Sequence, residues 1–275
     1  MNFLFILDFY LQNGLYQSKH EYPEKFNNLL FFAGLNQINI EHIHAYCDKR
    51  KNDGVKNATI NRELTIARSA INYYNKHHDA NVKNPFNGFK LFEEDFIPTY
   101  LTKADCQRLI QACKRYGNEV FTAYIALLIY TGCRAGELIT LQWENVFLDD
   151  GYLIIRNSLS KNKKTVYKPL NSQAVQILQA LKDSKLSSEW VFVNVNTATH
   201  YKNFRKPWAN VLQMSNLNIR LHDLRHTFAS LLVQQGVPIY HVSQLLGHSD
   251  TRITQRYAHL GKNNLSDVVA LLNIE

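Results

Sequence analysis

The chain has 275 residues, and its 31 lysines and arginines against 23 aspartates and glutamates give a formal net charge of +8. This balance excludes a strongly acidic protein and favours a polyanionic partner. Hydrophobic residues make up 45% and charged residues 20% of the chain, as in a folded globular protein. Because the length exceeds what one hydrophobic core usually fills, we expect two domains.

The amino-terminal residues 1–8 are apolar, but they carry no basic region and no small-residue cleavage site. Asp8 interrupts them well short of the roughly 20 apolar residues that a membrane span needs. No CxxC pair occurs among the four cysteines, so we expect neither a disulfide framework nor a zinc site. The sequence therefore predicts a cytoplasmic protein with reduced structural thiols, no membrane contact, no metal and no cofactor.

The first part of the chain is predicted to be helical. Apolar residues recur at helical spacing in 26–33 and again in 60–74, with Thr59 as the expected N-cap of the second helix. Turn formers and clustered acids without any period follow in 83–98, which is typical of a linker. We expect a helical domain at 1–92 and a second domain at 93–275.

The second domain is predicted to be mainly helical with a small β-sheet. Its elements are expected in this order: a helix that begins at 102–105, a buried helix at 120–130, a helix that resumes at 137–143, β-rich runs at 151–155 and 165–170 that form a hairpin or a three-stranded sheet, and helices from Ser172 to Leu272.

Both domains are basic, since residues 1–90 sum to +3 and residues 91–275 to +5. The densest run, 161–164 together with Lys168, lies on the predicted hairpin. A solvated face is one explanation of such a run. Basic residues interleaved with aromatic and amide residues across both domains are also the composition of a two-part clamp that binds nucleic acid.

Three segments and one tyrosine carry the most specific pattern. They are TGCRAGEL at 131–138, LHDLRHTFA at 221–229, LLGHSD at 245–250, and Tyr257 in TQRYAH. In order and spacing they resemble the catalytic domain of the tyrosine recombinase (phage integrase) family, strongly over residues 100–262. Residues 1–90 resemble the helical core-binding domain of that family only through ATINRE at 58–63.

The resemblance implies a two-domain fold, a helical core-binding domain followed by an integrase-type catalytic domain. It implies that Tyr257 attacks the scissile phosphate, forms a 3′-phosphotyrosyl bond and releases a 5′-hydroxyl, so that strands are rejoined without metal or ATP. It also implies a lysine general acid on the hairpin. Counting back from Pro169 matches Lys161 to it, with Lys163 and Lys164 as competing candidates.

The residue types suit phosphoryl transfer independently of that resemblance. The transition state carries extra negative charge on its non-bridging oxygens, and the chain offers no acidic cluster or HExxH that would hold metals. Arginine can supply the charge instead, because its guanidinium binds phosphate bidentately and stays protonated. Arg134, after the break at Gly132, is one such candidate, with Glu137 one turn on either orienting it or merely pairing with it.

Histidines accompany the second arginine. His222 and Arg225 are three residues apart and share a helix face, so that one phosphate can meet both side chains. The adjacent His226 is rotated by about a hundred degrees and is expected to be structural. His248 follows Gly247 at a predicted helix junction and is expected to donate a hydrogen bond to the phosphate.

The family resemblance further implies double-stranded DNA as partner, a homotetramer on two duplexes and possible accessory DNA-bending proteins. An apolar tail at 266–272 either docks on a neighbouring protomer or packs in cis, and no further arm-binding domain is expected ahead of residue 93. Two alternatives stay open. One is a catalytically inactive, basic helical DNA-binding protein; the other is a metal-dependent nuclease that uses His222, His226 and His248.

Overall fold

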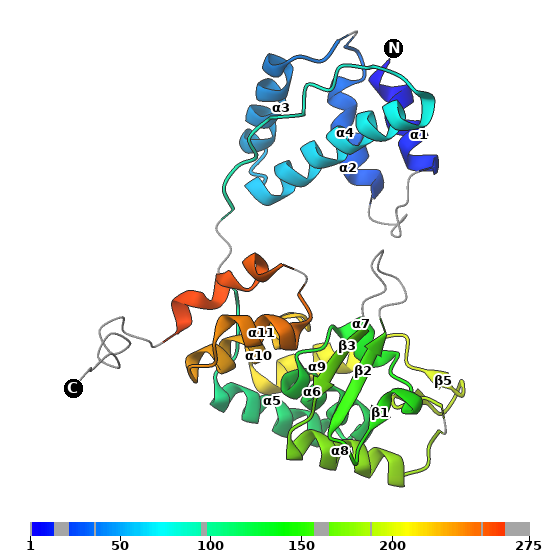
Figure 1. The fold of residues 1–275 in the computed structure, drawn as a ribbon, viewed down its shortest axis with the longest axis vertical. Helices are drawn as coiled ribbons and strands as arrows, with labels where there is room; N and C mark the ends of the chain where they lie inside the picture. Colours follow the sequence, from blue (N-terminus) through cyan, green and yellow to red (C-terminus); the bar gives the residue numbers. More distant parts are fainter. Residues whose placement is uncertain are drawn as a thin grey trace, which may run out of the picture. The chain divides into compact units, whose positions relative to one another are not determined.

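The computed structural model describes residues 2–13, 22–35, 37–94, 98–156, 165–187, 189–248 and 250–261. The chain divides into two units, Met1–Asp95 and Phe96–Glu275 (Figure 1). The sequence placed the boundary at 92/93, and the division in the structure falls at 95/96.

The amino-terminal unit is helical. Its described elements are α1 (Phe3–Asn13), α2 (Tyr22–Leu29), the 3₁₀ helix η1 (Leu30–Phe32), α3 (Ile40–Asn52) and α4 (Asn57–His78). The helices α1, α2 and α3 each pack against α4 and enclose one apolar core.

The expected cap at Thr59 is wrong, because α4 begins at Asn57 and its N-cap is Lys56. Gly54, with a φ of 73°, reverses the chain directly after α3. The next helix therefore begins before Thr59, which lies in its first turn.

One buried carboxylate organises the polar interior of this unit. The side chain of Glu63 is fully buried and accepts hydrogen bonds from Arg50 Nη2 at 2.8 Å and from the Tyr46 hydroxyl at 2.8 Å. Arg50 Nε and Asn28 Nδ2 donate to it at 3.1 and 3.0 Å. Every contact of this network joins side chains of the same unit, so the buried charge is paired where it lies.

The carboxyl-terminal unit contains most of the chain. Its described elements are α5 (Lys103–Tyr116), α6 (Glu119–Thr131), α7 (Ala135–Ile139), η2 (Trp143–Asn145), β1 (Val146–Phe147), β2 (Tyr152–Arg156), β3 (Thr165–Pro169), α8 (Ser172–Asp183), β4 (Val193–Asn194), β5 (Thr199–His200), α9 (Arg205–Ser215), α10 (Asp223–Gln234), α11 (Ile239–Leu246), η3 (Thr251–Ile253) and η4 (Gln255–Leu260).

The helix α6 forms the centre of this unit and contacts α5, α7, α8 and α10. Nine of its 13 residues are buried, as the apolar run at 120–130 predicted. The helix α5 begins as predicted, with Thr102 as N-cap in a capping box with Asp105. The predicted helix at 137–143 is shorter in the structure, where α7 ends at Ile139.

The predicted small sheet is present as the antiparallel order β1-β2-β3. In its register Arg156 lies opposite Thr165. Residues 157–164, and with them Lys161, Lys163 and Lys164, lie outside the described residues, as does the tail at 266–272.

The expectation of uninterrupted helices after Ser172 is wrong, because β4 and β5 pair as a second antiparallel sheet. The reason lies in the composition of 191–199, where β-branched valine and threonine flank asparagines. Valine and threonine favour extended backbone, and asparagine favours the turn between the two strands.

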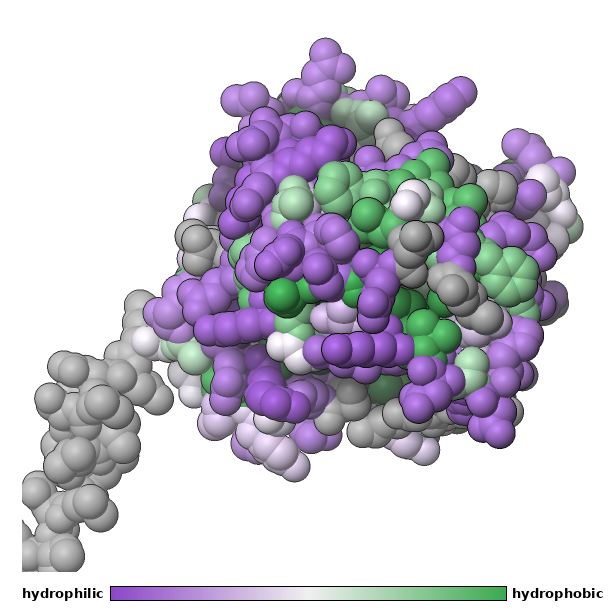
Figure 2. All heavy atoms as spheres, turned by 90° about the horizontal axis from the view of Figure 1, so that it is seen from above, coloured by the Kyte–Doolittle hydropathy of each residue, from purple (hydrophilic) through white to green (hydrophobic). Residues whose placement is uncertain are grey.

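The surface mixes polar and apolar residues, as Figure 2 shows for one face of the molecule. Exposed large apolar side chains of the amino-terminal unit include Phe5, at 57% exposure, and Leu30, at 46%. Among the described residues, no helix has both the length and the apolar composition to cross a membrane.

Candidate active site

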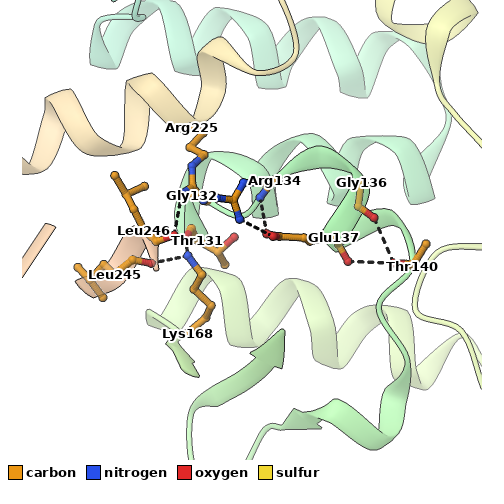
Figure 3. Close-up of polar contacts among 10 residues, drawn as sticks. All are labelled: Thr131, Gly132, Arg134, Gly136, Glu137, Thr140, Lys168, Arg225, Leu245 and Leu246. Carbon is orange, nitrogen blue, oxygen red and sulfur yellow. Dashed lines mark hydrogen bonds and ion pairs between the residues drawn. The ribbon is translucent and has the colours of Figure 1, made fainter. Parts of the chain in front are cut away.

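The candidate site lies where the end of α6, the start of α10 and the end of α11 come together beside β3 (Figure 3). The helix α6 ends at Thr131, and its C-cap, Gly132, has a φ of 59°. A Cβ atom at this position would lie 2.4 Å from the Phe228 ring. Only glycine can therefore take the left-handed conformation and allow α10 to approach, which places the following residues at the site.

Arg134 is the N-cap of α7, and its side chain is 45% exposed. Its Nη1 donates to Glu137 Oε1 at 2.6 Å, while its backbone N–H donates to Glu137 Oε2 at 3.1 Å. Glu137 thus fixes both the backbone and the guanidinium of Arg134. The two readings of this pair, orientation and ion pairing, therefore describe the same contact.

Arg225 is buried, with 4% of its surface exposed. Its Nη1 donates to the carbonyl of Gly132 and its Nη2 to the carbonyl of Leu246, each at 2.7 Å. Burial, followed by repulsion from Arg134, lowers the pKa of Arg225 to about 10. The guanidinium stays charged at neutral pH, and both of its hydrogen-bond partners are uncharged.

His248 follows α11, which ends at Gly247 with a φ of 69°. A Cβ atom at Gly247 would lie 2.9 Å from the Val166 side chain, so glycine is required where the chain passes β3. His248 Nδ1 forms a hydrogen bond of 2.7 Å with the Thr254 hydroxyl. Consequently Nε2 is the ring nitrogen with which His248 can meet a substrate.

The electrostatic surroundings of His248 are strongly positive. Burial lowers its pKa most, and four cations contribute in the order Arg225, Arg134, Arg256 and Lys168, which together bring the pKa to about 4. The imidazole is therefore neutral at pH 7. Such a concentration of cations around one side chain disfavours further positive charge and favours an anion.

Tyr257 lies in η4 and is 2% exposed. Its hydroxyl forms a hydrogen bond with Nδ1 of His226, and the two ring centroids are 5.8 Å apart. Burial raises the pKa of Tyr257, while Arg256 and Arg225 lower it. The phenol is therefore protonated at rest, and it lies beside both a nitrogen base and two cations.

His226 is a site residue that the sequence assigned to structure only. Burial, followed by repulsion from His222, lowers the pKa of His226 to about 4, so its ring is neutral at pH 7. The helical rotation that separates it from the His222 and Arg225 face turns it toward Tyr257 instead. The sequence indicated that His226 lies on a different helix face, but only the position of η4 shows that this face meets Tyr257.

His222 lies at the N-terminus of α10, and its side chain is exposed. Its ring lies edge-on to that of His226, with the centroids 5.0 Å apart. Partial desolvation and the neighbouring Arg225 cation lower the pKa of His222. The structure thus brings Arg134, His222, Arg225, His248 and Tyr257 into one region of the carboxyl-terminal unit.

Lys168 also lies in this region, although in the sequence only its charge, as part of the densest basic run, distinguished it. It is 2% exposed, and its Nζ donates to the carbonyls of Leu245 and Thr131, the latter at 3.4 Å. Burial lowers its pKa to about 8. The alternation of β3, in which Val166 is half-buried and Lys168 buried between exposed neighbours, could have placed Lys168 on the inner face together with Val166.

The described residues contain no group of three or more His, Cys, Asp and Glu side chains that could hold a metal ion. The three histidines of the nuclease hypothesis thus form no such group in that part of the chain. All four cysteines are buried and unpaired.

Comparison with known proteins gives a consistent result. A model described as the phage integrase family matches residues 99–264. The integrase of Salmonella phage P22 is 29% identical over 181 residues, which cover 61% of this chain and 45% of that protein. The integrase of Haemophilus phage HP1 is 28% identical over 220 residues, which cover 80% of this chain and 61% of that protein.

The chain therefore spans between about half and three fifths of the length of these curated relatives. Among solved structures, the Tn1549 transposon integrase in complex with circular intermediate DNA matches with a TM-score of 0.77 at 17% identity, over 100% of both chains. This likeness extends the shared fold over both units.

Proposed function

The chain belongs to the phage integrase family, and we propose that it is a site-specific recombinase that cuts and rejoins double-stranded DNA. The observation that carries this proposal is the excess of cations at the site. Four cations, Arg134, Arg225, Arg256 and Lys168, lower the pKa of His248. Two carboxylates act on the described site residues: Glu137 on Arg225 and Lys168, and Asp223 on His222 and His226. A phosphodiester would supply the missing negative charge.

We assign the attack on phosphorus to Tyr257. Its proton passes to the neutral His226, with which the hydroxyl already forms a hydrogen bond. The phenolic oxygen then forms a bond to phosphorus while the bond to the 5′-oxygen breaks, which conserves the phosphodiester as a 3′-phosphotyrosyl ester. The 5′-hydroxyl of the second strand then attacks the phosphotyrosyl ester and releases Tyr257, which reverses these steps. No nucleotide cofactor is therefore needed.

The cations stabilise the pentacoordinate phosphorus. Arg134 lies on the exposed side and meets the non-bridging oxygens directly, with His222 and Nε2 of His248 as hydrogen-bond donors. The buried Arg225 adds positive charge behind the surface of the site, and its hydrogen bonds fix the backbone at Gly132 and Leu246. Fixed charges of this kind act without reorganisation when the charge develops.

The departing 5′-oxygen needs a proton, and we assign the donation of this proton to Lys161, which lies between β2 and β3 in the sequence. A DNA substrate with a bridging 5′-phosphorothiolate tests this assignment, because a thiolate leaves without protonation. This substrate should restore cleavage by Lys161→Ala and leave Tyr257→Phe inactive. Rescue of Lys163→Ala or Lys164→Ala, with Lys161→Ala as fast as wild type on ordinary DNA, would move the assignment along the sequence.

The likeness to a transposon integrase that was solved in complex with DNA supports DNA as the partner, and we propose that four protomers act on two duplexes. The direct test incubates the protein with DNA fragments that flank its gene and resolves the products on a denaturing gel. We expect a covalent protein–DNA adduct that forms in EDTA and is absent from Tyr257→Phe. DNA binding by the wild type without any adduct would favour the inactive DNA-binding alternative, and loss of cleavage in EDTA would favour the nuclease.

A further inference from the structure

Two buried cations each form hydrogen bonds with the same two backbone segments, the end of α6 and the end of α11. Arg225 binds the carbonyls of Gly132 and Leu246, and Lys168 binds the carbonyls of the preceding residues, Thr131 and Leu245. In Figure 3 the two side chains reach these carbonyls from opposite sides. Lys168 and Arg225 therefore connect the end of α6 to the end of α11 twice, at consecutive residues.

Both connected segments lead directly into the site. The end of α6 continues into Arg134 within two residues of Gly132, and the end of α11 continues into His248 within two residues of Leu246. The distance between Arg134 and His248 is thus set by how these two helix ends are held together. A shift of one segment against the other would move one of these side chains away from the phosphate.

We propose that Lys168 is a positioning residue of the recombination reaction, which fixes the ends of α6 and α11 so that Arg134 and His248 face one phosphate. This inference rests on the proposed function. Lys168 is not a catalytic residue, because its 2% exposure and its two carbonyl partners keep Nζ away from a bound strand.

The energetics of Lys168 point to function rather than stability. Removal of an ammonium group from water costs several kcal/mol, and carbonyl dipoles return only part of that. The neighbouring Arg225 and Arg134 cations add repulsion, which Cys133 and Glu137 offset in part. An apolar side chain of similar length would fill the same space at a lower cost in folding free energy. The presence of lysine is therefore explained by its hydrogen bonds to the carbonyls of Thr131 and Leu245.

The test compares Lys168→Met with Lys182→Met, which removes an exposed lysine at the end of α8. Methionine preserves the length and removes the charge. We expect Lys168→Met to unfold at the same or a higher temperature and to bind DNA as the wild type does. Its rate of adduct formation at saturating DNA should fall on the order of 100-fold, since a displacement of about 1 Å has that effect.

The same variants are examined by hydrogen exchange, which does not depend on activity. The amides of Gly132, Gly247 and His248 donate hydrogen bonds at the two helix ends, to Leu128, Gln244 and Ser243 respectively. In Lys168→Met these amides should exchange faster, while the rest of the unit and Lys182→Met should not change. Unchanged exchange would overturn the proposal, even if the wild type formed no adduct and the proposed function itself failed.

The phosphorothiolate substrate separates positioning from proton transfer. A positioning role predicts that Lys168→Met stays slow on this substrate, because a displaced arginine still fails to stabilise the phosphorus. Rescue by the substrate would overturn the proposal and make Lys168 the general acid. Wild-type cleavage by Lys168→Met on ordinary DNA would overturn it as well.

Discussion

The two units bury charge in opposite ways. In the amino-terminal unit Glu63 is surrounded by Arg50, Tyr46 and Asn28, all of which donate to it, so the network is closed and its charge is compensated. In the described part of the carboxyl-terminal unit, the side chains of Arg225 and Lys168 donate their hydrogen bonds to backbone carbonyls. Because carbonyl dipoles carry no net charge, they do not neutralise these cations, which can still attract an anion.

This difference separates a structural ion pair from a prepared binding site. A closed pair stabilises a fold only modestly against an apolar alternative, but loss of one partner is costly. A set of cations without counter-charges lowers the stability of the free protein, and the binding of an anion stabilises the protein again. Substitutions in the Glu63 network should therefore change folding, and substitutions around His248 should change chemistry.

The largest expected effect is that of Tyr257→Phe, which deletes only the oxygen that attacks phosphorus. The variant should form no covalent adduct with any DNA substrate, a complete loss in a denaturing-gel assay. Because the phenyl ring still fills its place beside α10 and α11, the affinity for DNA should stay within a few-fold of the wild type. An adduct formed by this variant would remove Tyr257 as nucleophile.

The next largest effect is expected for Arg134→Ala. Its side chain is 45% exposed, so loss of its ion pair with Glu137 should cost folding stability less than about 1 kcal/mol. Cleavage at saturating DNA should fall by about 10²- to 10³-fold, as for removal of one transition-state donor. In Glu137→Gln the Arg134 guanidinium remains but its ion pair with residue 137 is lost, so the cleavage rate should fall less than in Arg134→Ala. Equal losses in DNA affinity and cleavage rate would assign Arg134 to substrate binding instead.

The sequence predicted well what depends on local patterns. The buried α6, the capping box at Thr102, the β2–β3 hairpin and the break at Gly132 follow from periodicity and turn chemistry and are confirmed. The strands at 193–200 were missed because each is two residues long, and pairs this short leave no periodic pattern. The cap of α4 was missed because Lys56 offers no capping side chain.

The candidate site was only partly predictable, for a related reason. Residues that match a motif, such as Arg134 and Arg225, could be named from order and spacing. Lys168 and His226 matter because of contacts with Leu245 and Tyr257, which are 77 and 31 residues away along the chain. A pattern within one strand or helix gives the face that a side chain occupies, but not what another segment places there.

A stability effect of moderate size is expected from Glu63→Gln in the amino-terminal unit. It removes the buried negative charge and leaves Arg50 with the exposed Asp53, at 3.3 Å, as its ion-pair partner among the described residues. The free energy of unfolding of this unit should therefore fall by about 3 kcal/mol. Denaturant unfolding measures this loss. Joint replacement of Arg50 and Glu63 by methionine should restore part of it, and adduct formation per folded molecule should not change. A rate of cleavage that fell as far as stability would contradict the separation of the two units.

The smallest expected effect is the pH dependence of the stability difference between Lys168→Met and the wild type. The pKa of Lys168 is lowered from 10.5 to about 8 when the protein folds. Between these values the unfolded chain keeps a proton that the folded chain has released, so wild-type stability rises with pH. Below pH 8 both states hold the proton, and the cost of burying the charge is fully present. Lys168→Met should therefore be the more stable protein at pH 7.

That advantage should shrink between pH 8 and 10.5, by no more than about 3 kcal/mol. Denaturant unfolding of both proteins across this range measures it. The neighbouring Cys133, Glu137, Arg134 and Arg225 remain in both proteins, so the difference in stability between the two reports on Lys168. Lys182→Met is the control, and its stability should follow that of the wild type across this range, because Lys182 is exposed at the end of α8. Parallel curves for Lys168→Met as well would mean that Lys168 is not buried as a cation, and the contrast with the compensated Glu63 network would lose one of its two buried charges.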